Sequence, residues 1–374
     1  MTGHIGSLKS SRAFIVALAM LGVLNFGAYR IADVAEDGTK QVVRCKRQWA
    51  QGDWIAKEAG GRDIVLFLGN SKVSAGIVPE LFDRANGGKV ISFNMALPAL
   101  PLGPHYFLLK EYLRHNPAPK YIVMTLSPGG LKHELMPYYA PINAGLDEVV
   151  AYSFLRKDVD ILINRLFPLR FYWPEIRRYF TGKTLAFISQ KVSERERREY
   201  AGGSGKKETF RHDWDRLFHL KYLDFEKTAH HREELLKSNR GYYFIVEQAV
   251  VGGALPDDFE VQRAPPREAA GAPAVQGGGE ENDPFVARFF DLAASKNIQV
   301  ILVADYVLSA ADRGPGVLPD EWRQARTRYP NVTFARFAPH YFPPRFFSDP
   351  GHVNPMGAVR YTLEIAAEFK ACAR

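Results

Sequence analysis

The sequence of 374 residues predicts an α/β fold, a three-layer α/β/α sandwich with a mostly parallel sheet. One observation is a set of short apolar runs, rich in β-branched and aromatic residues and bounded by turn residues, which is typical of strands buried on both faces. The other is that segments with apolar residues at helical spacing separate these runs. Two additions to this fold are expected, a helical insertion and an N-terminal transmembrane helix.

The individual elements follow from these patterns. The expected strands are Ile64–Leu68, Val90–Phe93, Tyr121–Met124, Val300–Val303 and Val332–Phe334. The expected helices are Pro79–Ala85, Pro104–His115, Pro284–Ser295 and Pro355–Phe369. Because these strands alternate with helices along the chain, they are expected to pair in parallel, with helices on both faces of the sheet.

The N-terminus carries the longest apolar run of the chain. Ala13 to Tyr29 contains no charged residue and follows Lys9 and Arg12. A membrane-spanning helix needs roughly 17–25 apolar residues, so we expect a transmembrane anchor over 13–32, with 1–12 as a cytoplasmic tail. A cleaved signal peptide remains an alternative, because the small residues Gly27 and Ala28 are compatible with a cleavage site.

Charge does not fix the orientation of this anchor. More basic residues follow the apolar run than precede it, and the positive-inside rule alone would then place the C-terminal side in the cytoplasm. Long C-terminal domains, however, cross a membrane largely regardless of nearby charge. Both topologies therefore remain open from charge alone.

The rest of the chain divides by composition. We expect a helical stalk at 33–61, the α/β domain in two parts at 62–150 and 285–374, a basic helical insertion or cap at 151–250, and a flexible linker rich in Pro, Gly and Ala at 251–284. The aromatic and basic residues around Phe171–Trp173 suit a lipid surface or an acidic glycan. A packed cap with a charged outer face is the alternative.

Charge and cysteine content exclude several classes of function. The net charge is +8, but much of the excess lies between residues 151 and 240, and no basic stripe falls on a nucleic-acid-binding motif. We therefore expect no nucleic-acid partner. Cys45 and Cys372 are the two cysteines, and no Cys/His spacing resembles a zinc site, so no metal or other cofactor is expected. One disulfide and two free thiols both remain possible for this pair.

A serine follows the first expected strand directly, in the sequence Gly69-Asn70-Ser71. In open α/β sheets, functional sites form beyond the carboxyl ends of the strands. A turn at this place can also direct backbone N–H groups toward a developing oxyanion. The alternative is a turn serine that satisfies its own backbone.

The C-terminal part supplies the groups that such a serine needs as a nucleophile. Asp349 precedes His352 by three residues, and Asn354 and Pro355 suit the N-cap and first position of the helix that follows. A serine hydroxyl becomes a nucleophile when a positioned base takes its proton. We therefore predict a catalytic triad of Ser71, His352 and Asp349. A capping turn with an exposed histidine is the alternative.

Three segments together resemble the SGNH (GDSL-like) hydrolase superfamily: Gly69 to Leu81, Ser92 to Ala99, and Asp349 to Asn354. Within it, the chain is similar to membrane-anchored members such as the alginate O-acetylation and teichoic acid D-alanylation proteins. The resemblance covers about 63–127 and 297–374 and leaves out the insertion. It implies a flavodoxin-like sheet, Ser71 as nucleophile and backbone oxyanion donor, His352 as base, and Asp349 as the acid that orients it.

The chain departs from the pattern of this superfamily in three places. Asn70 stands where an acid is usual, Ala99 or Ala96 stands for the glycine of the second block, and the Gly-x-Asn of the third block is not visible at Thr125–Gly130. The candidate oxyanion or substrate-binding residues are therefore Asn94, Ala99 and Ser127. For Asn94, a structural role at the end of a strand is the alternative.

The resemblance implies a membrane-anchored, extracytoplasmic acyltransferase. We expect a single-pass protein of the inner (cytoplasmic) membrane with its catalytic domain in the periplasm. It would transfer an acyl group, expected to be acetyl, to a cell-surface polysaccharide through a Ser71 acyl-enzyme. The resemblance also implies a polytopic membrane acyltransferase as partner. An esterase acting on the same kind of polymer and a catalytically silent scaffold subunit of a modification or export complex are the alternatives.

Overall fold

The computed structural model groups the chain into two compact units, one formed by 1–41 and 136–203 and the other by 42–135 and 204–374. It describes a subset of the residues. In the first unit these are 15–16, 19–27, 38–41, 145–156 and 159–167. In the second unit they are 42–98, 103–126, 234, 236–242, 284–308, 327–335, 339–349 and 351–373.

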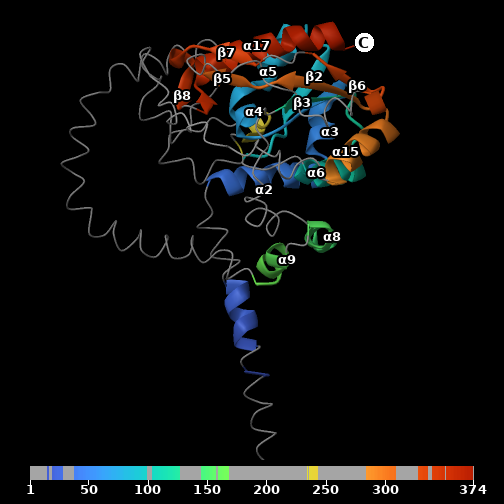
Figure 1. Ribbon diagram of the computed structural model, residues 1–374, viewed down its shortest axis with the longest axis vertical. Helices are drawn as coiled ribbons and strands as arrows, with labels where there is room; N and C mark the ends of the chain where they lie inside the picture. Colours follow the sequence, from blue (N-terminus) through green and yellow to red (C-terminus); the bar gives the residue numbers. More distant parts are fainter. Residues whose placement is uncertain are drawn as a thin grey trace, which may run out of the picture. The chain divides into compact units, whose positions relative to one another are not determined.

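The second unit contains a five-stranded parallel sheet with the strand order β2-β1-β3-β4-β6 (Figure 1). The strands are β1 (Asp63–Leu68), β2 (Val90–Asn94), β3 (Tyr121–Leu126), β4 (Gln299–Ala304) and β6 (Val332–Phe334). Nearly every residue of β1, β2 and β4 is buried, which explains why their sequences are continuously apolar rather than alternating. The predicted α/β fold with a mostly parallel sheet is confirmed.

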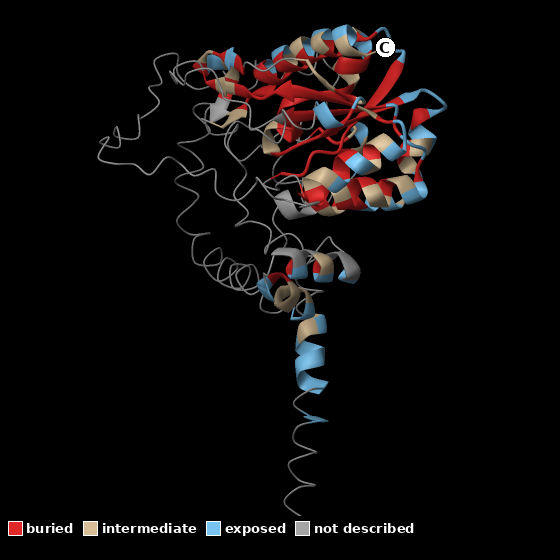
Figure 2. Cartoon of the chain, turned by 45° about the vertical axis from the view of Figure 1, so that its right-hand side comes forward, coloured by how far each residue is buried: buried red, intermediate tan, exposed pale blue. Residues whose placement is uncertain are grey.

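Helices cover both faces of this sheet, and the buried residues lie between the layers (Figure 2). On one side lie α4 (Ser71–Gly76), α5 (Pro79–Ala85) and α17 (Pro355–Cys372). Here Phe82 of α5 packs edge-on against Phe67 of β1 and Phe369 of α17, with ring centroids 4.8 and 5.0 Å apart. On the other side lie α2 (Gly38–Gln51), α6 (Gly103–His115) and α15 (Pro284–Ser295).

The segment expected to be a stalk, 33–61, packs into the α/β unit from residue 42 onward. Over this range α2 and α3 (Trp54–Ala59) are helical as expected, but Val42, Val43 and Trp49 are buried. The Asn116 amide, which follows α6, donates to the carbonyls of Ala50 and Gly52 at 3.2 and 2.8 Å. The apolar face of α2 was not recognised as a core element, and it makes these residues part of the domain rather than a spacer.

In the first unit, the described part of the expected anchor, 15–16 and 19–27, is helical. None of the helices that the structure describes is both long and apolar enough to traverse a bilayer. The expected span 13–32 extends beyond the described residues. The same unit contains α8 (Leu146–Arg156) and α9 (Val159–Leu166), which contact each other.

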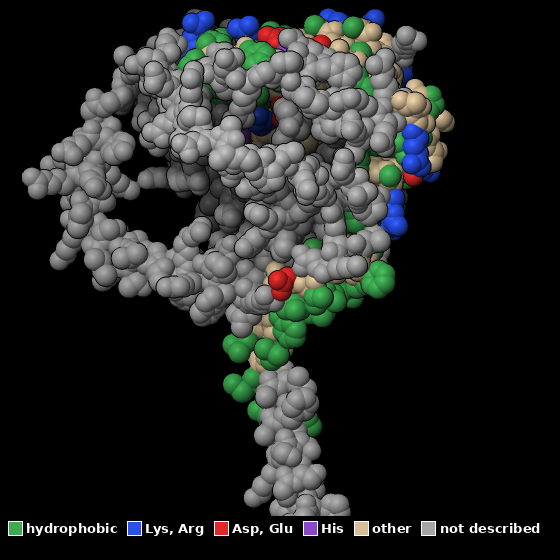
Figure 3. All heavy atoms as spheres, viewed as in Figure 1, with side chains coloured by type: hydrophobic (Ala, Val, Ile, Leu, Met, Phe, Trp, Pro, Cys, Tyr) green, Lys and Arg blue, Asp and Glu red, His purple; other side chains and the backbone are tan. Residues whose placement is uncertain are grey.

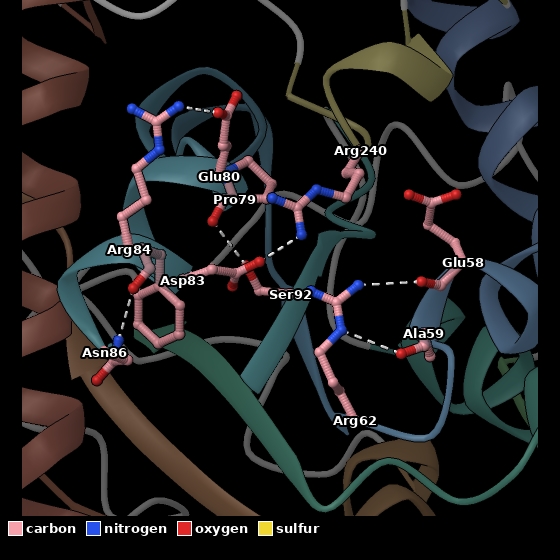
Figure 4. A network of polar contacts seen from close by, with 11 residues as sticks. Glu58, Ala59, Arg62, Pro79, Glu80, Asp83, Arg84, Asn86, Ser92 and Arg240 are labelled. Atoms are coloured by element: carbon pink, nitrogen blue, oxygen red, sulfur yellow. Dashed lines mark hydrogen bonds and ion pairs between the residues drawn. The ribbon is translucent and has the colours of Figure 1, made fainter. Parts of the chain in front are cut away.

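Most of the predicted insertion and all but the end of the predicted linker lie outside the described residues. The described turn 236–242 docks on the edge strand β2, where the Asn94 N–H donates to the Arg240 carbonyl at 2.8 Å. The Arg240 guanidinium forms an ion pair with Asp83 of α5, and the Ser92 hydroxyl of β2 donates to the Pro79 carbonyl at 3.1 Å (Figure 4). Burial raises the pKa of Asp83, and the neighbouring Arg240 opposes that shift.

Candidate active site

Ser71 lies at the carboxyl end of β1, as the sequence predicts, because a glycine allows a sharp turn there. Gly69 has φ +149°, and a Cβ at this position would lie 2.5 Å from Val73 Cγ2 and 2.9 Å from Thr125 Oγ1. A larger residue would therefore be strained at this point. Asn70 is the N-cap of α4, and its side-chain oxygen accepts the Lys72 N–H at 2.9 Å. Asn and Asp serve this role about equally, so the cap at this position does not require an acid.

His352 lies directly against this serine. Its Nε2 is 2.9 Å from Ser71 Oγ, although the two residues are 281 positions apart in the sequence. This distance is a normal hydrogen bond and is the separation required between a nucleophile and its general base. Both residues are half-buried.

A tight local structure fixes His352. The strands β8 (Phe347–Asp349) and β9 (His352–Val353) form an antiparallel pair, and α17 begins two residues after β9. Asn354 is the N-cap of α17, as predicted, and its side-chain oxygen accepts the Gly357 N–H at 3.1 Å. A Cβ on Gly357 would lie 2.3 Å from the Phe346 carbonyl oxygen, so only glycine fits. His352 is therefore held between a hairpin and a rigid helix start.

Asp349 is opposite His352 in this hairpin. The described part of Asp349 is its backbone, so its predicted role in orienting the imidazole stays a prediction.

Of the predicted oxyanion residues, Asn94 has a different role. Its side chain is fully buried, and its amide nitrogen donates to the Val73 and Ile77 carbonyls at 2.8 and 3.0 Å. Asn94 therefore binds the C-terminal end of α4, the helix that begins with Ser71, which corresponds to the structural alternative. The prediction is wrong because the sequence alone does not show that Asn94, at the end of β2, contacts the C-terminal end of α4. Ala99 and Ser127 lie outside the described residues.

A buried lysine completes this network and was not predicted. Lys46 of α2 donates from Nζ to Ser74 Oγ at 3.2 Å, Asn94 Oδ1 at 3.4 Å and the Ala96 carbonyl at 2.8 Å. Complete burial lowers its pKa well below the ordinary value of 10.5. One signal was available, since Lys46 lies at helical spacing on the same face as Val42 and Trp49.

Tyr306 is the second residue that was not predicted, and it links the two halves of the site. It begins the short strand β5 (Tyr306–Leu308), which pairs with β7 (His340–Phe342), and its side chain is fully buried. Its hydroxyl donates to the Lys72 carbonyl at 3.2 Å and accepts the Val353 N–H at 3.4 Å. The residue after the serine and the residue after the histidine are thus joined through one hydroxyl.

Lys72 also binds Tyr306 through its side chain. Its Nζ donates to the Tyr306 carbonyl at 3.1 Å and lies 3.9 Å from the buried Asp305 carboxylate. Gly76 makes room for the aromatic ring, since a Cβ there would lie 2.8 Å from Tyr306 Cε1. The amino-terminal and carboxy-terminal parts of the α/β domain therefore meet in several contacts around the Ser71–His352 pair.

Among the residues that the structure describes, no group of three or more His, Cys, Asp or Glu side chains could hold a metal ion. The described site contains a serine and a histidine in contact, which is the core of nucleophilic acyl transfer. No family model and no curated protein matches this chain.

Proposed function

We propose that this protein is a serine acyltransferase of the SGNH type. The observation that carries the proposal is the 2.9 Å contact between Ser71 Oγ and His352 Nε2 at the carboxyl end of a parallel sheet. Ser71 lies three residues after the end of β1 and His352 three residues before the start of α17, and these positions support membership of that superfamily.

In the proposed reaction, His352 Nε2 takes the proton of Ser71 as the serine oxygen attacks the carbonyl carbon of an acyl donor. The tetrahedral intermediate collapses, the donor's leaving group takes the proton from His352, and the acyl group remains as an ester on Ser71. A hydroxyl of the acceptor then loses its proton to His352 and attacks this ester. The acyl group passes to the acceptor, and the proton returns to Ser71. In this scheme the Ser71 N–H is one donor to the oxyanion, and Asp349 orients the imidazole.

The acceptor we propose is a cell-surface polysaccharide, and the acyl group is acetyl. The N-terminal helix supports a location at a membrane, because its described side chains include exposed Val23, Leu24 and Phe26. Leaving apolar surface in water costs roughly 25 cal/mol per Å², whereas a bilayer removes that cost. We propose a single-pass inner-membrane anchor with the catalytic domain in the periplasm, where a polytopic acyltransferase supplies the acyl group. Water as the acceptor would make the same site an esterase.

The first test is labelling of the full-length protein in detergent with a fluorophosphonate probe. We expect the wild type and a Ser295→Ala control to be labelled, because Ser295 is a surface serine that donates to its own helix. Ser71→Ala should not react, and His352→Ala should react at least about 100-fold more slowly, as for loss of a general base.

Labelling that persists in Ser71→Ala would contradict the assignment of the nucleophile. A folded wild-type protein that never reacts would instead favour the silent scaffold. If the serine does react, radiolabelled acetyl donors would separate transfer from hydrolysis, because transfer places the label on the glycan and hydrolysis releases it as acetate.

A further inference from the structure

The helix α8 turns an apolar face outward. Leu146, Val150 and Phe154 are spaced four residues apart, so they lie on one side of the helix, and they are 53%, 47% and 84% exposed. Val149 and Ser153, which flank this side, are buried, so the helix packs along one edge of its apolar stripe and leaves the rest exposed. Three large apolar side chains of α8 are therefore exposed, although the apolar stripe of a surface helix usually faces the core.

The neighbouring helix α9 does the same. Val159, Leu166 and the adjoining Phe167 are 61%, 54% and 41% exposed, while Ile161 is buried. Hydrophobic side chains accordingly gather at the surface over α8 and α9 (Figure 3). Single exposed apolar residues are ordinary, but two contacting helices that both expose such residues indicate a surface that is covered in the working protein.

Two observations indicate that a lipid bilayer covers this surface. The first is that α8 and α9 belong to the same compact unit as residues 1–41, whose described helix also exposes large apolar side chains along its length. The second is the sequence that follows α9. From Phe167 to Phe180 it contains six aromatic residues, with three arginines against one glutamate. Aromatic and arginine side chains are typical of the headgroup level of a membrane, where anionic lipids attract the positive charge.

We propose that the exposed faces of α8 and α9, defined by Leu146, Val150, Phe154, Val159, Leu166 and Phe167, insert into the interfacial layer of a phospholipid bilayer. This inference rests on the membrane attachment in the proposed function and extends it from a single anchor to a whole unit. The chain passes between the two compact units at 41/42, 135/136 and 203/204. A membrane-bound first unit therefore tethers the catalytic unit through three connections, whereas a lone anchor would provide one.

The test is site-directed spin labelling of the full-length protein in vesicles of phosphatidylethanolamine and phosphatidylglycerol. The background carries Cys372→Ser, and the buried Cys45 is retained. Labels are placed by Phe154→Cys, by Val23→Cys in the expected anchor, and by Leu363→Cys on α17 as a matched control. Leu363 is also apolar and 45% exposed but belongs to the second unit. Power saturation measures collision with oxygen, which concentrates in lipid, and with a water-soluble nickel chelate.

We expect the ratio of oxygen to nickel collisions at Phe154 to exceed that at Leu363 several-fold and to approach that at Val23. A Phe154 label that collides with nickel as often as the Leu363 label, with Val23 still in lipid, would overturn this inference and leave the anchor intact. A Phe154 label shielded from both reagents would also overturn it, since a protein partner would then cover the surface. Nickel access at Val23 as well would overturn the membrane attachment itself.

Discussion

The serine side and the histidine side of the site are held by different kinds of contact. The contacts on the histidine side are local. They come from the β8–β9 hairpin, the Asn354 cap and Gly357, which are all close to His352 in the sequence. The serine side depends on residues far along the chain, since Lys46 and Asn94 bind the helix that Ser71 begins. Local contacts can be read from a motif, whereas distant ones need the folded structure. Tyr306 is the point at which the two sides meet.

The largest effect is expected on the histidine side. In Gly357→Ala the new Cβ would approach the Phe346 carbonyl oxygen and the Val353 side chain, and a backbone atom cannot move aside as a side chain can. We expect a loss of about 3 kcal/mol in unfolding free energy, as for an overpacked core, together with loss of fluorophosphonate labelling. Urea denaturation measures the first quantity. Gly87→Ala is the control, because its positive φ adds strain without a steric contact. Equal losses in the two variants would show that the close contact at Gly357 is unimportant.

The next largest effect is expected for Lys46→Met, which removes the contacts of Lys46 on the serine side. The substitution removes the amine and leaves Ser74, Asn94 and Ala96 without this donor, which costs roughly 1–3 kcal/mol for an unsatisfied buried group. The substitution also removes the cost of burying the Lys46 amine, which offsets part of this loss. Because the contacts hold α4, we expect slower labelling of Ser71 as well as lower stability. A variant with unchanged labelling would separate this network from the site.

Lys46 also predicts a dependence of stability on pH. Its pKa is lowered in the folded protein, so between that lowered value and the ordinary 10.5 the unfolded chain binds more protons than the folded one. Stability should therefore rise with pH across this window and level off above it. Lys46→Met should lose this rise. Urea titrations of both proteins from neutral to alkaline pH measure the difference, and parallel curves would contradict the assignment.

A smaller effect tests the link between the two sides. Tyr306→Phe keeps the buried ring but removes the hydroxyl that joins Lys72 to Val353, at a cost of about 1 kcal/mol. Tyr361→Phe is a matched control, because this tyrosine is equally buried and its hydroxyl donates to the Ala304 carbonyl at 2.9 Å. We expect similar losses of stability, but a lower labelling rate only in Tyr306→Phe. Equal labelling rates would make Tyr306 a packing residue.

The smallest effect is expected for Asn70→Asp, which introduces the acid of the pattern that the sequence resembles. Both side chains accept a hydrogen bond at an N-cap, so we expect stability to change by less than about 0.5 kcal/mol and Ser71 to react as before. Thermal unfolding and labelling rates check this. A marked change in reactivity would show that the group at position 70 does more than cap α4.

The same contrast explains how much the sequence could predict. All five strands of the sheet and the helices over 79–85 and 284–295 lie where their apolar patterns place them. The short strands β5, β7, β8 and β9 were not predicted, because each has only two or three residues and none is the kind of short, continuous apolar run that identified the strands of the sheet. In the site, Ser71 and His352 follow turn and cap motifs. Lys46 and Tyr306 act through partners 28 to 234 positions away, which no local pattern reveals.

The wide separation of Ser71 and His352 has a consequence for synthesis. A ribosome makes the chain from its N-terminus, so Ser71 is made 281 residues before His352. The two last strands of the sheet and α17 are also made late. In the proposed mechanism, therefore, a nascent or truncated chain that ends before His352 carries an unactivated serine. In that mechanism the reactive centre forms only after His352 has been made and has folded against Ser71.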